Sequence, residues 1–165
     1  MNALAEILET IAHAPIEKRA ITNHNVLNEA YCYGKPSSFS RGMRIDIGEV
    51  TILLISGTAS IDEKGQSVHI GDFRAQMRRT LANITGLLAS EGCTWHDIVR
   101  TTCYLRDIER DYEAFNEERT AFFKEQGLDP LPASTGIQAI LCRPELLIEI
   151  EAIAMFRNKR DSGKE

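Results

Sequence analysis

The sequence predicts a single domain of two layers, in which two helices pack on one face of a mixed β-sheet. Length, composition and hydrophobic periodicity support this prediction. The 165 residues match the usual size of one domain, and 43% of them are hydrophobic against 26% charged. Two stretches with apolar residues at helical spacing alternate with short β-branched runs, in the order strands, helix, strand, helix, two strands.

The composition narrows the classes of function. The chain carries 19 Lys and Arg against 24 Asp and Glu, a formal charge of -5, which disfavours a general binder of nucleic-acid backbones. No apolar run approaches the ~20 residues of a membrane span, and the N-terminus lacks the layout of a signal peptide. We therefore expect a cytoplasmic protein without a membrane or nucleic-acid partner.

The cysteines and histidines show no ligand spacing. These residues are Cys32, Cys93, Cys103, Cys142, His13, His24, His69 and His96. Because C-x-x-C and Cys/His motifs are missing from the sequence, neither a disulfide framework nor a metal site is expected. Walker, G-x-G-x-x-G and G-x-S-x-G motifs are missing too, so we expect no cofactor. All thiols except that of Cys142 are predicted to be buried and structural.

The chain divides into an extension, one domain and a tail. The extension covers residues 1–18 and holds a short amphipathic helix over 2–14. A polar run over 17–19 separates it from the domain, which spans 19–157. A charged, flexible tail covers 158–165.

The first part of the domain is predicted to contain three strands. Residues 34–38 form a loop, and short strands over 30–33 and 43–46 flank it. The third strand covers 50–55 and is apolar on both faces, which is typical of a strand covered from both sides. Small residues over 56–60 end this strand.

Two helices follow, each with a clear beginning and end. Asp72 is the predicted N-cap of the first, and Gly92 occupies its C′ position. Its apolar residues recur at helical spacing: Phe73, Met77, Leu81, Ile84, Leu87 and Leu88. Thr94 to Asp97 cap a short turn before a strand over 98–105. The second helix covers about 109–126 and ends at Gly127. Its predicted buried residues are Tyr112, Phe115, Ala121 and Phe122.

The closing strands, over 135–141 and 146–156, follow a rigid loop at 128–132. In the last strand the period of two places Glu149 and Glu151 on the face opposite a row of apolar residues. Such a pair is either solvated or salt-bridged, or it lies at a subunit boundary, where burial would raise a carboxyl pKa and favour proton transfer.

The strands over 50–55 and 148–153 are apolar on both sides, although helices are predicted on one sheet face only. Burial of the second face between copies of the chain is the simplest explanation. We therefore expect a cyclic homo-oligomer.

Several motifs occur together in one consistent order. They are Ser56-Gly57-Thr58, Gly71-Asp72 with Gln76, Leu81-x-Asn83-Ile84, Thr101-Thr102-Cys103-Tyr104-Leu105-Arg106-Asp107, Phe115-Asn116, Phe122-Phe123, Pro132-Ala133 and Ile148-Glu149-Ile150-Glu151-Ala152-Ile153-Ala154. From about residue 43 to 156 the chain thereby resembles the RidA (YjgF) family of imine and enamine deaminases. The resemblance implies an α+β, chorismate-mutase-like fold and a homotrimer whose sheets form a closed barrel, with three clefts between adjacent subunits.

The same resemblance implies a set of site residues. The family glutamate, which helps to position the attacking water, falls on Glu149. In the deaminating members an arginine directly follows Pro-Ala and grips the substrate carboxylate through a two-pronged salt bridge. This chain has Ser134 at that position. The family's loop tyrosine falls near Phe39, which lacks the hydroxyl.

A second resemblance is to the C-terminal half of chorismatases. It rests on the stretches over 56–61, 67–72 and 141–151. Those enzymes act on the enolpyruvyl ether of chorismate with a catalytic glutamate and, in one subtype, a cysteine seven residues before it. Cys142 and Glu149 have that spacing. Protonation of an enol ether or an enamine at carbon creates a cation that water can attack, so the two chemistries are related.

The sequence thus provides two candidate catalytic residues, Glu149 and Cys142. The candidate substrate-binding residues are Ser134, Thr135, Gly136, Phe39, Asn116 and Arg143. Ser134, Thr135 and the Gly136 N–H are neutral donors that suit a carbonyl or hydroxyl group. Arg143 or Arg41 could replace the missing carboxylate anchor, with a solvated guanidinium as the alternative for either.

The resulting function hypothesis is an enzyme that hydrolyses or tautomerises a small enamine, imine or enol ether in a cleft between subunits. Glu149 would be the acid/base or water-positioning group, and Cys142 a neighbouring polar or acid group. The alternatives are chorismatase-like hydrolysis of an enolpyruvyl ether and a trimeric metabolite-binding protein without turnover. Ribonuclease activity, which the family carries in one of its names, is disfavoured by the charge of -5.

Overall fold

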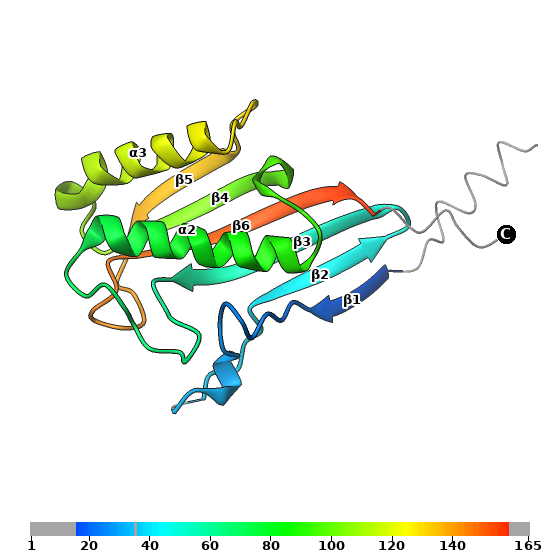
Figure 1. Ribbon diagram of the computed structural model, residues 1–165, viewed down its shortest axis with the longest axis horizontal. Coiled ribbons are helices and arrows are strands. Elements are labelled where there is room, and N and C mark those ends of the chain that lie inside the picture. Colours follow the sequence, from blue (N-terminus) through cyan, green and yellow to red (C-terminus); the bar gives the residue numbers. More distant parts are fainter. Residues whose placement is uncertain (1–15, 35, 159–165) are drawn as a thin grey trace, which may run out of the picture.

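A six-stranded mixed sheet with two helices on one face makes up the protein (Figure 1). The computed structural model describes residues 16–34 and 36–158. The predicted helix over 2–14 and most of the predicted tail lie outside the described residues. The elements are β1 (Ile16–Ala20), a 3₁₀ turn (Ala30–Cys32), β2 (Gly42–Ile47), β3 (Val50–Ala59), α2 (Phe73–Ser90), a second 3₁₀ turn (Trp95–Asp97), β4 (Ile98–Leu105), α3 (Ile108–Glu125), β5 (Ala133–Gln138) and β6 (Ile148–Arg157).

The strand order is β1-β2-β3-β6-β4-β5, so the last strand of the chain lies between β3 and β4. Neighbouring strands are antiparallel except β4 and β5, which run parallel. A parallel pair needs a crossover connection, and α3 provides it. This mixed α+β sheet with both helices on one face confirms the predicted fold class.

Both helices have the caps that the sequence predicts. The carboxylate of Asp72 accepts a hydrogen bond from the Ala75 N–H at 3.0 Å, and Gly92 follows α2 with φ +72°. Asp107 caps α3 in the same way through the Arg110 N–H at 3.0 Å. In α2 the predicted apolar residues are all buried. In α3 Phe115 is buried and Phe122 half-buried, but Tyr112 and Ala121 are exposed, because the helix covers the sheet near its β5 edge and buries a narrower stripe.

The structure corrects one predicted strand and one predicted boundary near the start of the domain. Residues 30–32 form a 3₁₀ turn rather than a strand, because the Cys32 N–H donates locally to the Glu29 carbonyl at 2.9 Å. The polar run over 17–19 belongs to β1, so the boundary drawn at residue 18 falls inside a strand. Arg19 on this strand pairs with the buried carboxylate of Glu91, which explains a charged residue there.

Strand β3 is longer than predicted. It continues through the small residues over 56–59, because a bulge between Ile55 and Thr58 lets pairing with β6 resume at Thr58 and Ala59. The other predicted strands lie within three residues of their observed bounds.

The two faces of the sheet differ. Alternate residues of β6, from Ile148 to Ala154, are buried beneath the helices, while Glu149 and Glu151 lie on the opposite face. The register places a row of large apolar side chains on this open face: Met43, Ile45, Ile47, Val50, Ile52, Leu54, Ile153 and Met155. Leu54 is 41% exposed and Met155 47% exposed. In residues 16–34 and 36–158, neither helix covers this face.

Within the described part of the chain, no helix combines the length and the apolar character needed to cross a bilayer.

Candidate active site

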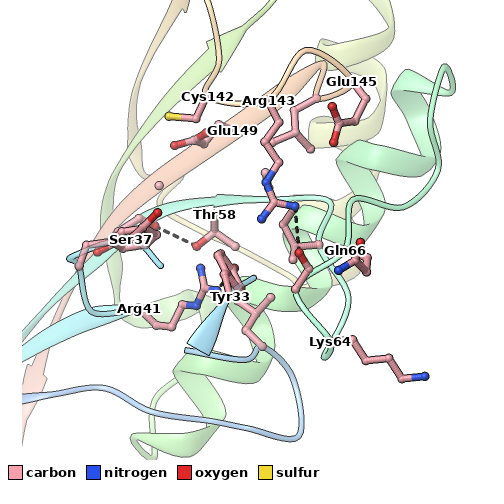
Figure 2. Close-up of a pocket in the computed structure, with 18 of the residues that line it drawn as sticks. Tyr33, Ser37, Arg41, Thr58, Lys64, Gln66, Cys142, Arg143, Glu145 and Glu149 are labelled. Atoms are coloured by element: carbon pink, nitrogen blue, oxygen red, sulfur yellow. Dashed lines mark hydrogen bonds between the residues drawn. The ribbon is translucent and has the colours of Figure 1, made fainter. Parts of the chain in front are cut away.

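A cleft of about 930 Å³ opens at one end of the sheet (Figure 2). Four segments form most of its walls: residues 33–34 with 37–41, the end of β3 with residues 56–61, the turn over 64–66, and residues 142–151; Leu27 also lines it. The turn packs against the first segment, since a Cβ at Gly65 would overlap the Tyr33 ring. Asn83 of α2 fixes the β3 end by donating to the carbonyls of Ala59 and Ile61 at 3.0 and 2.9 Å.

Glu149 projects from β6 into this cleft beside the β3 bulge. A Cβ at Gly57 would overlap its Oε1 atom, so the glycine leaves room for the carboxyl group. Burial, together with the nearby charge of Glu151, raises the pKa of Glu149. No hydrogen bond or ion pair to its carboxyl group occurs within the described ranges. A carboxyl group with a raised pKa holds its proton more tightly than a solvated one, a property that suits a general acid.

Tyr104 lies opposite Glu149 in the β4–β6 register. Burial and the neighbouring carboxylates of Glu151 and Glu149 raise the pKa of this phenol. The tyrosine therefore stays protonated and can act as a hydrogen-bond donor on the carboxylate-bearing face of the sheet.

The segment from Leu141 to Leu147 is fixed by two polar side chains from elsewhere in the fold. Arg106 donates to the carbonyls of Leu146 at 2.5 Å and Arg143 at 2.6 Å. Gln76, fully buried on α2, donates to the Glu145 carbonyl at 2.9 Å and accepts from the Leu147 N–H at 2.8 Å. These bonds hold Cys142 and Arg143 in place at the entry to β6.

Four of the predicted site residues meet in this cleft: Glu149, Cys142, Arg143 and Phe39. Figure 2 shows Cys142 next to Glu149, with Arg143 reaching across the cleft from the same segment. The Cys142 residue is exposed, and Phe39 is 42% exposed. The closing motif of the sequence thus assembles one wall of a site.

The other four predicted residues lie outside the cleft of their own chain. Ser134, Thr135 and Gly136 belong to β5, the edge strand, whose residues are all exposed. The Ser134 hydroxyl accepts from Arg119 at 3.1 Å, and Thr135 accepts from Arg100 at 3.0 Å. Asn116 on α3 accepts from Arg119 at 2.6 Å. Their role in substrate binding stays a prediction.

Sequence reasoning missed three features of the cleft. Tyr33 lies between two arginines, although the sequence predicted only a short strand there. Gly57 marks the bulge that admits Glu149, a position that Ser-Gly within a β-branched run could have signalled. Glu145 is the third missed feature. A hydrogen bond from Ser67, a hydrogen bond from its own backbone and the charges of Arg143 and Arg106 lower the pKa of its carboxyl group, so it remains ionised.

The fold and the cleft together define an α+β protein with a half-buried carboxyl group of raised pKa at the end of a mixed sheet. The family model described as Endoribonuclease L-PSP matches residues 36–156. The chain therefore belongs to this family, which confirms the resemblance to RidA and YjgF proteins drawn from the sequence.

Named relatives agree with this assignment. The 3-aminoacrylate deaminase RutC of Acinetobacter baylyi is 35% identical over 103 residues, which cover 62% of this chain and 78% of RutC. The 2-iminobutanoate/2-iminopropanoate deaminase of Salmonella typhimurium is 33% identical over 113 residues, covering 68% and 84%. The crystal structure of the YjgF gene product from E. coli matches with a TM-score of 0.66 and 28% identity, covering 84% of this chain and 99% of that one.

Proposed function

We propose that this protein is a deaminase that hydrolyses a small imine or enamine, with Glu149 as its acid/base group. The position of Glu149 carries the proposal: its carboxyl group is half-buried in the cleft, has a raised pKa, and faces space that a substrate can occupy. RutC and the Salmonella relative, whose names specify an enamine and imines as substrates, support the reaction class.

The reaction needs one group that both gives and takes protons. An enamine first accepts a proton at carbon to become an iminium ion; an imine accepts it at nitrogen. Water then adds to the C=N carbon and loses a proton to the carboxylate, which returns it to the nitrogen. The C–N bond breaks to release ammonia, and the remaining hydroxyl group gives its proton to the carboxylate to leave the carbonyl compound. Glu149 supplies the first proton in its carboxylic acid form and takes the proton from water as a carboxylate. Burial raises the pKa of Glu149 and so makes its carboxylic acid form a more available proton donor than that of a solvated glutamate.

Cys142 acts beside Glu149 in this proposal. The two side chains are neighbours in the cleft, on the same wall (Figure 2). The thiol is a weak hydrogen-bond donor that can orient the water or the leaving nitrogen. The chorismatase-like alternative relied on the same pair of residues, but the relatives named above are deaminases of enamines and imines.

We further propose that the active assembly is a homotrimer, located in the cytoplasm. The apolar open face of the sheet and the exposed edge strand β5 both need a partner. In such an assembly Ser134, Thr135 and the Gly136 N–H of one subunit would reach the cleft of the next. The four cysteines are free thiols, which fits a reducing compartment.

The test is ammonia release from 2-iminopropanoate, generated in the cuvette from alanine by an amino-acid oxidase. We expect the protein to accelerate release, and Glu149→Gln to reduce the acceleration about 10²- to 10⁴-fold. Glu125→Gln, which changes an exposed carboxylate on α3, serves as the matched control. Full activity in Glu149→Gln would refute the assigned role, and RNA cleavage that persists in it would point to another site.

A further inference from the structure

We infer that Arg143 binds the carboxylate of the substrate, and that Arg41 and Tyr33 position it for this task. The inference deepens the proposed function and rests on it: it assigns the substrate class as imino or enamino acids that carry a free carboxylate. Two arginines and one aromatic ring, Arg41, Arg143 and Tyr33, lie together inside the cleft and support this assignment.

Tyr33 lies between the two guanidinium groups. The Cζ atom of Arg41 is 5.0 Å from the centre of the Tyr33 ring, and that of Arg143 is 5.1 Å from it. All three residues line the cleft (Figure 2). A ring face attracts a cation, so the tyrosine holds both side chains in fixed orientations. Two positive charges next to Tyr33 thus line the cleft into which Glu149 projects.

Arg41 is held by hydrogen bonds from two of its three nitrogens, Nε and Nη2. Its Nε donates to the Asn28 carbonyl at 2.9 Å, and its Nη2 contacts the same carbonyl and the Tyr33 hydroxyl. Arg41 is only 4% exposed. It is therefore a fixed cation beneath the cleft rather than a mobile ligand-binding arm.

Arg143 has donors to spare. Its Nη1 donates to the Gly65 carbonyl at 2.9 Å and to the Ser67 hydroxyl at 3.1 Å. Its Nε and Nη2 have no partner within the described part of the chain. Nε–H and one N–H of Nη2 point in parallel from the planar group, the arrangement that binds both oxygens of a carboxylate. The bonds to Gly65 and Ser67 fix this group before a ligand arrives.

Within the described residues, direct ion pairs do not neutralise the two guanidinium groups, although the ionised Glu145 lies near Arg143 and also lines the cleft. Neither guanidinium forms an ion pair with a carboxylate of residues 16–34 or 36–158. Burial and the charge of Arg143 lower the pKa of Arg41, while the carboxylate of Glu29 opposes them. Glu29 is itself buried, with an Oε1 atom that has no hydrogen-bond partner in the described chain. A bound carboxylate would offset the repulsion between the two arginines.

Arg143 offers the positive charge that is missing at position 134, where this chain has a neutral serine. The substrate names of RutC and of the Salmonella relative, 3-aminoacrylate and 2-iminopropanoate, both denote carboxylates. Ser134 is neutral and cannot form an ion pair. Arg143 stands six residues before Glu149 on the wall that holds Cys142, so a small acid held there lies within the same cleft as the acid/base group.

The test measures binding without turnover, with pyruvate as the probe and pyruvamide as its uncharged isostere. Pyruvate is the carbonyl product of 2-iminopropanoate hydrolysis. Calorimetry on the full chain is expected to show that the wild type prefers pyruvate. In Arg143→Gln, pyruvate binding should weaken roughly 10- to 100-fold while pyruvamide binding stays unchanged. Arg143→Lys should retain part of the preference, and the matched control Arg157→Gln all of it.

Three results separate the possibilities. Equal binding of pyruvate and pyruvamide by the wild type, or an unchanged preference in Arg143→Gln, would overturn the anchor. A loss of affinity for both probes in Arg143→Gln would also overturn it, because that pattern means a collapsed cleft. If carboxylate preference depends on Arg143 but no imine is hydrolysed, the binding assignment stands and the proposed deaminase function fails.

Discussion

Gly57 and Glu149 are in contact across the β3–β6 bulge, and the glycine is what makes the carboxyl position possible. A Cβ at Gly57 would overlap Oε1 of Glu149 and stand 3.0 Å from its carboxyl carbon. The bulge between Ile55 and Thr58 shifts the strand at this point, so the carboxyl group occupies space beside backbone rather than beside a side chain. The bulge and the missing side chain at Gly57 therefore determine where the Glu149 carboxyl group lies.

Gly57→Ala is expected to reduce ammonia release about 10-fold or more, because the added methyl group must displace the Glu149 carboxyl from the cleft. We also expect a loss of about 1–3 kcal/mol in the free energy of unfolding, the usual cost of overpacking. Gly34→Ala is the matched stability control, since no atom lies within 4 Å of a Cβ there. Wild-type turnover in Gly57→Ala would show that the carboxyl position does not matter.

Glu149 should also influence how stability depends on pH. Its pKa is raised in the folded protein, mainly by burial, so the folded state holds this proton more tightly than the unfolded chain. Its contribution to stability is therefore largest below the ordinary carboxyl pKa of about 4.3 and is lost as pH rises through the raised value. Glu149→Gln removes that loss, and we expect the variant to be more stable than the wild type at pH 8.

The measurement is the midpoint of thermal unfolding between pH 4 and 8 at one protein concentration, for wild type, Glu149→Gln and Glu125→Gln. Glu118 and Glu145 have lowered pKa values, which weaken the protein toward acid in all three proteins alike. The difference between wild type and Glu149→Gln therefore isolates Glu149. A difference that does not change with pH would contradict its raised pKa.

Much of the fold follows from local patterns in the sequence. The helix of residues 73–90 and its Asp72 cap were predictable because periodicity and capping chemistry are local. The alternation in β6 likewise placed Glu149 on the face opposite the buried residues. The 3₁₀ turn at residues 30–32 lies in an irregular segment that no periodicity describes, so it was not predictable. The β3 bulge was signalled only by Gly57, because its register depends on pairing with the distant strand β6.

The candidate site was only partly predictable for a similar reason. Glu149, Cys142 and Arg143 are close in sequence, so one motif located all three. Tyr33 and Arg41 come from an irregular segment that no periodicity describes, and their meeting with Arg143 depends on packing against the turn at Gly65. Ser134 was identified, but its place relative to a cleft depends on a second subunit.

The four thiols should react in two classes. Cys142 is exposed. Cys32 is exposed too, so the prediction of a buried thiol there is wrong, because this residue lies in a 3₁₀ turn outside the sheet. Cys93 is buried, and burial together with the nearby charges of Asp97 and Glu91 raises its pKa to about 12; burial also raises the pKa of Cys103. Because the thiolate is the reactive form, iodoacetamide at pH 8 should modify two cysteines in the native protein and four after denaturation, counted by mass spectrometry. Cys142→Ser should remove one native site, and rapid labelling of Cys93 would contradict this expectation.

The open sheet face provides the last prediction. Leu54 and Met155 lie on it in adjacent strands and are each exposed by more than a third. If subunits associate through this face, Leu54→Lys inserts a charge into an apolar interface, at a cost large enough to dissociate the assembly. We expect sedimentation to show the wild type at three times the 18.5 kDa of one chain and the variant at the monomer mass. Deaminase activity should fall with the assembly, because each cleft would lose the β5 residues of its neighbour.

Ala82→Lys, on the exposed surface of α2, is the matched control and should remain trimeric and active. A wild type that sediments as a monomer would refute the assembly, whereas an active monomeric variant would show that each cleft is complete within one chain.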